Sequence, residues 1–404
     1  MKYTNSFREI ADIFIDEIRL IFTDSGTVLI FLIAMFIYPL IYSLGYEKET
    51  VRELPVAVVD LDHSQMSRQY SRMVDATEQM QVSFKPGSLK EAEAMFYDGT
   101  VKGVVLIPAN FEKDVLHARQ ANVTVYCDAS YFMLYKQVYA GTTFANGTFA
   151  AGVEIKRLLA SGKTIDQAKD LQDPLKVNTY SINNPSGGYG SFVMPGMILV
   201  IMQQTLLLGI GMIGGTSREK KKFLKRTHPV IRKWGNVKLV LGKSLAYTSI
   251  YLLTAFFAVG ILPRMFSFPA NGNFWVIALM LIPYLLSVSF LGLSISLLFK
   301  QRVHSMLFLV FLSPMVVFLS GISWPTTSIP PLLHALSNVF PSTVLIPAYL
   351  RVEVGGAGFN SITTEWSYLL IQMCVYFVLA CISYKYALKR FGAKIGLNYT
   401  ISTK

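Results

Sequence analysis

The chain has 404 residues, of which 52% are hydrophobic and 15% are charged, and its mean hydropathy is +0.42. Soluble domains carry about 25% charged residues, so this composition excludes an ordinary soluble protein and indicates a membrane protein. The formal net charge of +12 is concentrated in one segment, 217–243, as in a cytoplasmic membrane-protein loop. We therefore expect no nucleic-acid partner.

The first segment, 1–25, is expected to form an amphipathic helix. Apolar side chains recur at helical spacing within 5–22, and the acids Glu9, Asp12, Asp16 and Glu17 fall on other faces. Such a helix lies in the membrane interface. The uncharged segment 26–46 follows and is long enough to cross about 30 Å of hydrocarbon, so we expect it to be the first transmembrane helix.

The segment 47–188 has a different texture and is expected to form an inserted α/β domain. Its part 47–185 carries 15 Lys and Arg against 17 Asp and Glu. Short apolar runs predict strands, and the stretches between them predict helices. The strands are expected at 56–59, 101–107 and 123–126, and the helices at 65–77, 89–97, 111–118 and 131–160.

Five further uncharged stretches predict transmembrane helices at about 189–215, 244–263, 274–299, 303–323 and 366–384. Between the last two, the apolar segment 324–349 is interrupted by five prolines, which favours a re-entrant helical hairpin over a seventh crossing. The fold class is therefore an α-helical polytopic membrane protein with six transmembrane helices, a re-entrant hairpin and an inserted extracytoplasmic α/β domain.

The loop 217–243 carries ten Lys and Arg and the single acid Glu219, so the positive-inside rule places it in the cytoplasm. Six crossings then place both termini in the cytoplasm and the 47–188 domain outside. The basic run suits a helix that docks on a partner protein, because Phe223, Leu224 and Val230 are apolar anchors among its cations. Contact with anionic lipid, or a merely solvated loop, is the alternative.

A nucleotide site is not expected in this chain. Gly242, Lys243 and Ser244 resemble the end of a phosphate-binding loop, but position 237 is Val237 where that loop needs glycine. No metal site is expected among the cysteines and histidines. We therefore expect no cofactor on this chain and an energy source on a partner.

Asp60 and Asp62 follow the first expected strand of the inserted domain. Two carboxylates could hold a divalent cation and a sugar nucleotide. A turn at the strand end, with an aspartate capping the helix start at 64–68, explains the same residues. Within the spans, the near absence of charge counts against an ion-coupled transporter. Polar residues such as Gln203 and Gln204 suit helix packing, or else a substrate path.

Four segments of the chain resemble the membrane subunit of ABC exporters of the ABC-2 type, and the resemblance covers essentially the whole chain. They are the domain start 54–62 with Ser67 and Arg68, the strands 103–108 and 125–128, the run 318–325 with Pro330 and Pro341, and Leu241–Lys243 at the end of the basic loop. One region departs from the family pattern, which usually has two acids flanking a glycine-threonine pair where this chain has 219–224. A heterodimer with a more regular sister subunit would explain the departure.

The resemblance implies an exporter permease in a bacterial inner membrane, working as a homo- or heterodimer with cytoplasmic ATPase subunits that bind ATP and magnesium. A periplasmic adaptor and membrane lipids are further implied partners. The resemblance assigns ATPase coupling to Glu219, Lys220, Lys221, Lys222, Phe223, Leu224, Lys225 and Arg226. It assigns the hairpin or gate to Ser320, Gly321, Trp324, Pro325, Pro330 and Pro341, and the outer-domain motif to Asp60, Asp62, Ser67 and Arg68.

Two other functions stay open at this stage. One is a membrane scaffold or sensor whose outer domain binds a ligand and whose basic loop recruits a cytoplasmic partner. The other is a membrane-anchored enzyme that uses Asp60 and Asp62.

Overall fold

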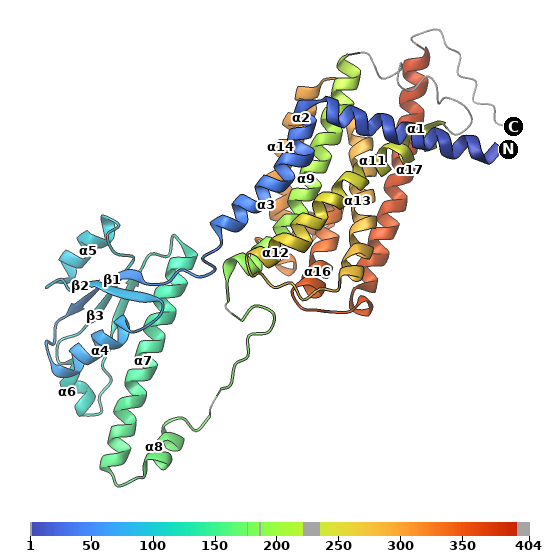
Figure 1. Ribbon diagram of the computed structural model, residues 1–404. Coiled ribbons are helices and arrows are strands. Elements are labelled where there is room, and N and C mark those ends of the chain that lie inside the picture. Colours follow the sequence, from blue (N-terminus) through green and yellow to red (C-terminus); the bar gives the residue numbers. More distant parts are fainter. Residues whose placement is uncertain (1, 176, 186, 221–234, 394–404) are drawn as a thin grey trace. The chain divides into compact units, whose positions relative to one another are not determined.

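The computed structural model describes residues 2–175, 177–185, 187–220 and 235–393 (Figure 1). It divides into two compact units: unit 1 comprises Met1–Glu49 and Ser181–Lys404, and unit 2 comprises Thr50–Tyr180. Unit 2 comes between the first two helices of unit 1 that are long enough to cross a membrane. The structure draws the boundaries at 50 and 180, inside the expected 47 and 188.

The boundary lies there because Glu49 joins the segment that leaves unit 1 to the segment that returns to it. The Glu49 carboxylate accepts hydrogen bonds from the backbone N–H of Ser191 at 3.1 Å and from its hydroxyl at 2.6 Å. The Tyr189 N–H donates to the Glu49 carbonyl at 2.8 Å. The segments by which the chain leaves and re-enters unit 1 are therefore hydrogen-bonded to each other.

Among the described residues, six helical segments are long and apolar enough to cross a membrane, which confirms the expected number. They are α2 (Ser25–Val28) with η1 (Leu29–Ile33) and α3 (Ala34–Gly45); α9 (Tyr189–Glu219); α11 (Gly235–Ala255) with η3 (Phe256–Ile261) and α12 (Leu262–Met265); α13 (Phe274–Ser296); α14 (Arg302–Leu319); and η5 (Phe359–Ile362) with α17 (Thr363–Ala393).

The basic loop is shorter than predicted. Helix α9 continues to Glu219 and helix α11 begins at Gly235, so 220–234 is all that separates them. Lys238 and Lys243, which fall within the predicted loop 217–243, belong to α11. The prediction ended each transmembrane helix where its uncharged stretch ends. In the structure, Lys238 and Lys243 form ion pairs with acids of another helix, so α11 can include both lysines.

Helix α9 is the central helix of unit 1. In its most apolar stretch 78% is buried, against 22% in the corresponding stretch of α14. Glycines near its end allow this close packing. A Cβ at Gly211 would lie 2.5 Å from Ser305 Oγ of α14, and one at Gly214 would lie 2.8 Å from Ser296 Cβ of α13. One face of α9 thus contacts α14 while another contacts α13.

The segment after α14 forms two short helices, α15 (Pro331–Ser337) and α16 (Pro341–Glu353), preceded by the 3₁₀ turn η4 (Thr326–Ser328). Each helix starts at a proline, whose missing N–H costs nothing at that position. Helix α16 packs against α9, α13 and α17. The prolines thus divide the segment into two short helices, which we call the hairpin segment, and its re-entry into the membrane stays a prediction.

Unit 2 contains a four-stranded sheet in the order β2-β1-β3-β4. Strand β1 (Leu54–Asp60) is parallel to β2 (Met80–Phe84) and β3 (Gly103–Ile107), and β4 (Thr124–Cys127) is antiparallel to β3. Its helices are α4 (Gln65–Asp75), α5 (Leu89–Tyr97), α6 (Phe111–Leu116), α7 (Phe132–Ala160) and α8 (Ile165–Gln172). Strand β2 was not predicted, because it is an edge strand with one buried residue, Met80.

Alternate residues of β1 point to opposite faces of the sheet and build two cores. Val56 and Val58 join the larger core with α4, α6 and α7, whereas Ala57 and Val59 join the smaller core with α5. The sheet is therefore buried on both sides, as expected of mainly parallel strands.

Candidate functional site

The ends of α9 and α11 flank the segment 220–234, and charged side chains from several helices meet there. We call this group the junction cluster. It consists of Glu9, Glu17, Asp24, Glu219, Lys238, Lys243 and Arg302. Helix α1 (Lys2–Thr23) lies across this end of unit 1, where α17 also ends (Figure 1).

Two ion pairs join α1 to the first turns of α11. Lys238 Nζ lies 2.6 Å from Glu9 Oε2, and Lys243 Nζ lies 2.5 Å from Glu17 Oε2. The hydroxyl of Tyr247 donates to the other oxygen of Glu17. Glu17 is only 5% exposed, so both of its oxygens are satisfied by protein donors, as a buried carboxylate requires.

The backbones of α1 and α11 approach closely between these ion pairs. A Cβ at Gly242 would lie 2.7 Å from Ile13 and 3.0 Å from the Ile10 carbonyl oxygen, so only glycine fits. The helical spacing predicted that Glu17 lies away from the apolar faces of this helix, and that was wrong. Glu17 shares the protein-facing side with Ile13 and Ile21, both buried. The opposite side exposes a separate apolar row of Phe7, Ile15 and Phe22.

Asp24 and Arg302 join the start of α2 to the start of α14 through a two-pronged ion pair. The two guanidinium nitrogens lie 2.5 and 2.9 Å from the two carboxylate oxygens. Asp24 also caps α2 by accepting the Thr27 N–H at 3.0 Å. Hydrogen bonding from Arg302 lowers the pKa of Asp24 against the opposing effect of burial. The pair therefore stays ionised at neutral pH.

Arg302 also connects α14 to the end of α9. Its backbone N–H donates to Glu219 Oε2 at 3.3 Å, and its guanidinium contacts Thr216 Oγ1 at the same distance. Glu219, a predicted coupling residue, thus lies in the junction cluster, and Lys220 follows as an exposed turn residue. The other predicted coupling residues, Lys221, Lys222, Phe223, Leu224, Lys225 and Arg226, lie outside the described residues.

Five of the six predicted hairpin residues lie between α14 and α15. Ser320 is buried and donates to the Val317 carbonyl at 2.6 Å. Gly321 has φ +84°, in the left-handed region that favours glycine. Trp324 is half exposed and donates to the Ser328 carbonyl at 3.4 Å. The prolines 325 and 330 are exposed along the turn, and Pro341 is buried at the start of α16.

Long-range hydrogen bonds hold the hairpin segment against the transmembrane helices. The Ser342 N–H donates to Gln203 Oε1 at 2.9 Å, which joins α16 to α9. The Gln372 amide of α17 donates to the Asn338 carbonyl between α15 and α16 at 2.9 Å. Gln203 therefore has a packing role. Its Nε2 and the whole amide of Gln204 have no hydrogen-bond partner within the described part of the chain.

The Asp60 motif forms a turn in unit 2. Asp60 Oδ1 accepts the N–H groups of Asp62 and His63, and Asp60 Oδ2 accepts the Ser67 hydroxyl at 2.7 Å. Ser64, not an aspartate, caps α4 by accepting the Ser67 N–H at 3.0 Å. Arg68 donates to the His63 carbonyl. These oxygens are used within the turn, and no group of three candidate metal ligands occurs among the residues described.

Asp62 joins the turn to a different element, because its Oδ2 accepts the Glu112 N–H of α6 at 3.0 Å. Burial opposes its charge, but hydrogen bonds from Ser64 and from backbone amides at the start of α6 outweigh that effect and lower the pKa of Asp62. A carboxylate whose pKa is lowered by folding stabilises the fold above its unfolded pKa, and this contribution is lost as the pH falls through the folded pKa.

Asp62→Asn is therefore expected to destabilise the start of α6 by about 1 kcal/mol. Hydrogen exchange of the 111–116 amides in the intact protein measures this, and the difference from wild type should shrink below about pH 4. Asp128→Asn is the matched control, because Asp128 accepts its hydrogen bonds among the described residues from Ser130 of its own turn. Equal α6 exchange in wild type and Asp62→Asn at neutral pH would contradict the assignment.

Comparison with known proteins identifies the class. The model of the ABC-2 family transporter proteins matches residues 25–382, which is most of the chain, so this protein belongs to that family. The inner membrane transport permease YhhJ of Escherichia coli (strain K12) is 20% identical over 385 residues, covering 94% of this chain and 97% of the relative. The protein of the same name from Shigella flexneri matches with the same values.

Proposed function

We propose that this chain is the transmembrane permease subunit of an ATP-driven exporter. It moves a hydrophobic or amphipathic substrate, such as a drug, a lipid or a lipid-linked molecule, out of the cytoplasm or the inner membrane. ATP and magnesium bind to a separate ATPase subunit. Membership of the ABC-2 transporter family supports this proposal, as does the permease name of the relatives.

The junction cluster is the observation that carries the proposal. It lies at both ends of 220–234, the segment in which the basic docking residues fall. Glu219 on one side contacts α14 through Arg302, and Lys238 on the other side contacts α1 through Glu9. A force that an ATPase exerts on this loop therefore reaches α14 through the hydrogen bond at Glu219, α2 through the ion pair of Arg302 with Asp24, and α1 through the ion pair of Lys238 with Glu9. A solvated loop with no mechanical role does not require such contacts at its two ends.

The same proposal sets the membrane topology. The loop, both termini and α1 lie on the cytoplasmic side of an inner membrane, and unit 2 lies outside. The exposed row of Phe7, Ile15 and Phe22 supports contact between α1 and the lipid interface, because it lies opposite the side that packs on α11. Its contact with lipid would keep α1 at the membrane surface beside the ATPase.

Helix α14 carries the surface that we assign to a second permease copy or a sister permease. It packs on α9 through the α9 glycines and leaves a continuous apolar face exposed. That face consists of Val303, Leu307, Val310, Phe311, Met315 and Phe318. In a dimer this face and α9 border the substrate path.

The hairpin segment of α15 and α16 is the gate in this proposal. Its turn residues Gly321 and Trp324 lie between α14 and α15, so a movement of α14 is transmitted to them directly. Gln203 and Gln372 tie the other end of the hairpin segment to α9 and α17. The hairpin segment therefore has one held end and one end that follows α14.

Co-purification tests the proposal. Tagged protein extracted in mild detergent is expected to retain an ATPase subunit, identified by mass spectrometry, and Phe223→Ala/Leu224→Ala is expected to reduce its recovery about tenfold by removing two apolar anchors. Leu171→Ala/Leu175→Ala in unit 2 is the matched control, because both side chains are exposed. If folded wild-type protein retains no ATPase in any detergent, the scaffold function replaces export.

A further inference from the structure

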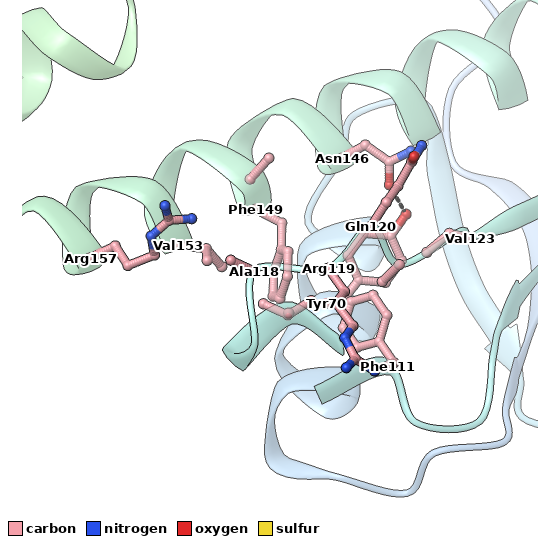
Figure 2. Close-up of a pocket in the computed structure, with 13 residues that line it drawn as sticks. Tyr70, Phe111, Ala118, Arg119, Gln120, Val123, Asn146, Phe149, Val153 and Arg157 are labelled. Carbon is pink, nitrogen blue, oxygen red and sulfur yellow. Dashed lines mark hydrogen bonds between the residues drawn. The ribbon is translucent and has the colours of Figure 1, made fainter. Parts of the chain in front are cut away.

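Unit 2 contains a cavity of about 510 Å³ between α4, α6 and α7 (Figure 2). Its floor is aromatic: Tyr70, Phe111 and Phe149 are 1%, 3% and 8% exposed. The Tyr70 and Phe149 rings meet edge to face with centroids 5.5 Å apart, and the centroids of Phe111 and Phe149 are also 5.5 Å apart. These rings brace one another, so the floor is rigid and formed before any ligand arrives.

The wall opposite α7 is the loop between α6 and β4. Ala118 in this loop has φ +57°, the left-handed conformation in which many helices end, and its N–H donates to the Val115 carbonyl of α6 at 3.2 Å. The Arg119 N–H donates to the Asp114 carbonyl at 2.7 Å and holds the loop in this shape. The loop therefore presents Arg119 and Gln120 to the cavity, as Figure 2 shows.

The cavity is positively charged. Arg119 lines it from the loop and Arg157 from α7, with their guanidinium groups at different ends of the view in Figure 2, and none of the 13 described residues that line it is acidic. Glu154 lies 3.3 Å from Arg157, but both side chains are largely exposed, so this surface pair is worth little. The Arg157 guanidinium therefore remains able to bind a second anion. The Tyr70 hydroxyl donates a hydrogen bond to Asn146 Oδ1, so the NH₂ group of Asn146 is the donor that this side chain offers to a ligand.

We propose that this cavity binds an amphipathic anion, with an aromatic ring or short alkyl chain against Tyr70, Phe149 and Val153 and a phosphate or carboxylate at the guanidinium of Arg119 or of Arg157. An apolar floor with two guanidinium groups at its rim matches this chemistry, since arginine binds such anions through paired hydrogen bonds. The volume lies within the usual range of small-molecule sites. The site is a property of unit 2 and does not depend on the assignment of export.

The test uses the full-length protein in lipid nanodiscs, with empty nanodiscs as the reference. The probes are 1-naphthyl phosphate and hexyl phosphate, and calorimetry measures their Kd. The cation 1-naphthylmethylammonium has the same ring and the opposite charge. We expect saturable binding of at least one phosphate, and binding of the cation about tenfold weaker or absent. Tighter binding of 1-naphthyl phosphate would indicate an aromatic ligand, and tighter binding of hexyl phosphate would indicate a lipid with an acyl chain.

Two variants probe different halves of the site. Arg119→Gln/Arg157→Gln should weaken phosphate binding about tenfold. Ala150→Trp places a large side chain at an exposed lining position and should abolish saturable binding with both arginines in place. Arg52→Gln/Arg72→Gln is the charge-matched control, because neither residue lines the cavity. Unchanged Kd in both cavity variants, or cation binding as tight as phosphate binding, would overturn the proposal.

Discussion

Replacing Lys243 with methionine is expected to destabilise unit 1 by about 3–5 kcal/mol, because Glu17 would then carry a buried charge without a cation. The Glu17 side chain is 6% exposed and the Lys243 side chain is 16% exposed, and their charged atoms lie 2.5 Å apart. Methionine keeps the length and apolar volume of lysine, so the loss reports the charge rather than a cavity. Thermal unfolding followed by tryptophan fluorescence measures the change.

The double variant Glu17→Gln/Lys243→Met should recover most of this loss, since no unpaired charge remains. Lys238→Met serves as the graded control, because its partner Glu9 is 26% exposed and water can solvate the remaining carboxylate. We expect it to cost about 1 kcal/mol or less. Equal stability of Lys243→Met and the wild type, or no recovery in the double variant, would argue against a buried pair.

Gly215→Ala is expected to separate the end of α9 from the start of α14. A Cβ at this position would lie 2.8 Å from the Arg302 backbone nitrogen and Cα and from the Gln301 carbonyl oxygen. Backbone atoms cannot rotate away as a side chain can, so the two helices must shift. Overpacking of this kind costs about 1–3 kcal/mol. The shift would also strain the Arg302 contacts with Asp24 and Glu219.

The matched control is Gly45→Ala, at the end of α3, where an added Cβ meets nothing within 4 Å. Because alanine favours the helix, that control should be neutral or stabilising by up to about 1 kcal/mol. Thermal unfolding of the two variants checks the first effect. If the export proposal holds, Gly215→Ala should also retain the ATPase on purification but lose ATP-driven transport in vesicles. Wild-type stability and transport in Gly215→Ala would contradict the predicted role of the junction cluster.

The enzyme alternative receives no support from the arrangement of Asp60 and Asp62. Their oxygens accept hydrogen bonds from the turn, from Ser67 and from the start of α6. They thereby connect β1 to two helices. The scaffold alternative differs from the proposed export function in one measurable respect, the presence of an ATPase on the purified chain.

Much of the architecture could be predicted from sequence because the responsible signals are local. A membrane span needs an uncharged segment of sufficient length, and the six spans satisfy this rule within their own residues. The prolines that start α15 and α16 act on their own helices as well. Strand β2 was missed because its edge position leaves one buried side chain, and its local pattern therefore resembles a loop.

The pairing of distant charges could be decided only by the tertiary structure. Glu17 and Lys243 are 226 positions apart, and neither residue's neighbours indicate the other. The one local sign was that Glu17 continues the four-residue spacing of Ile13 and Ile21, which places a carboxylate within an apolar row. The same holds for the aromatic cavity, whose Tyr70, Phe111 and Phe149 come from three helices. Hydropathy is a property of a segment, whereas neutralising a buried charge or closing a cavity requires segments that only folding brings together.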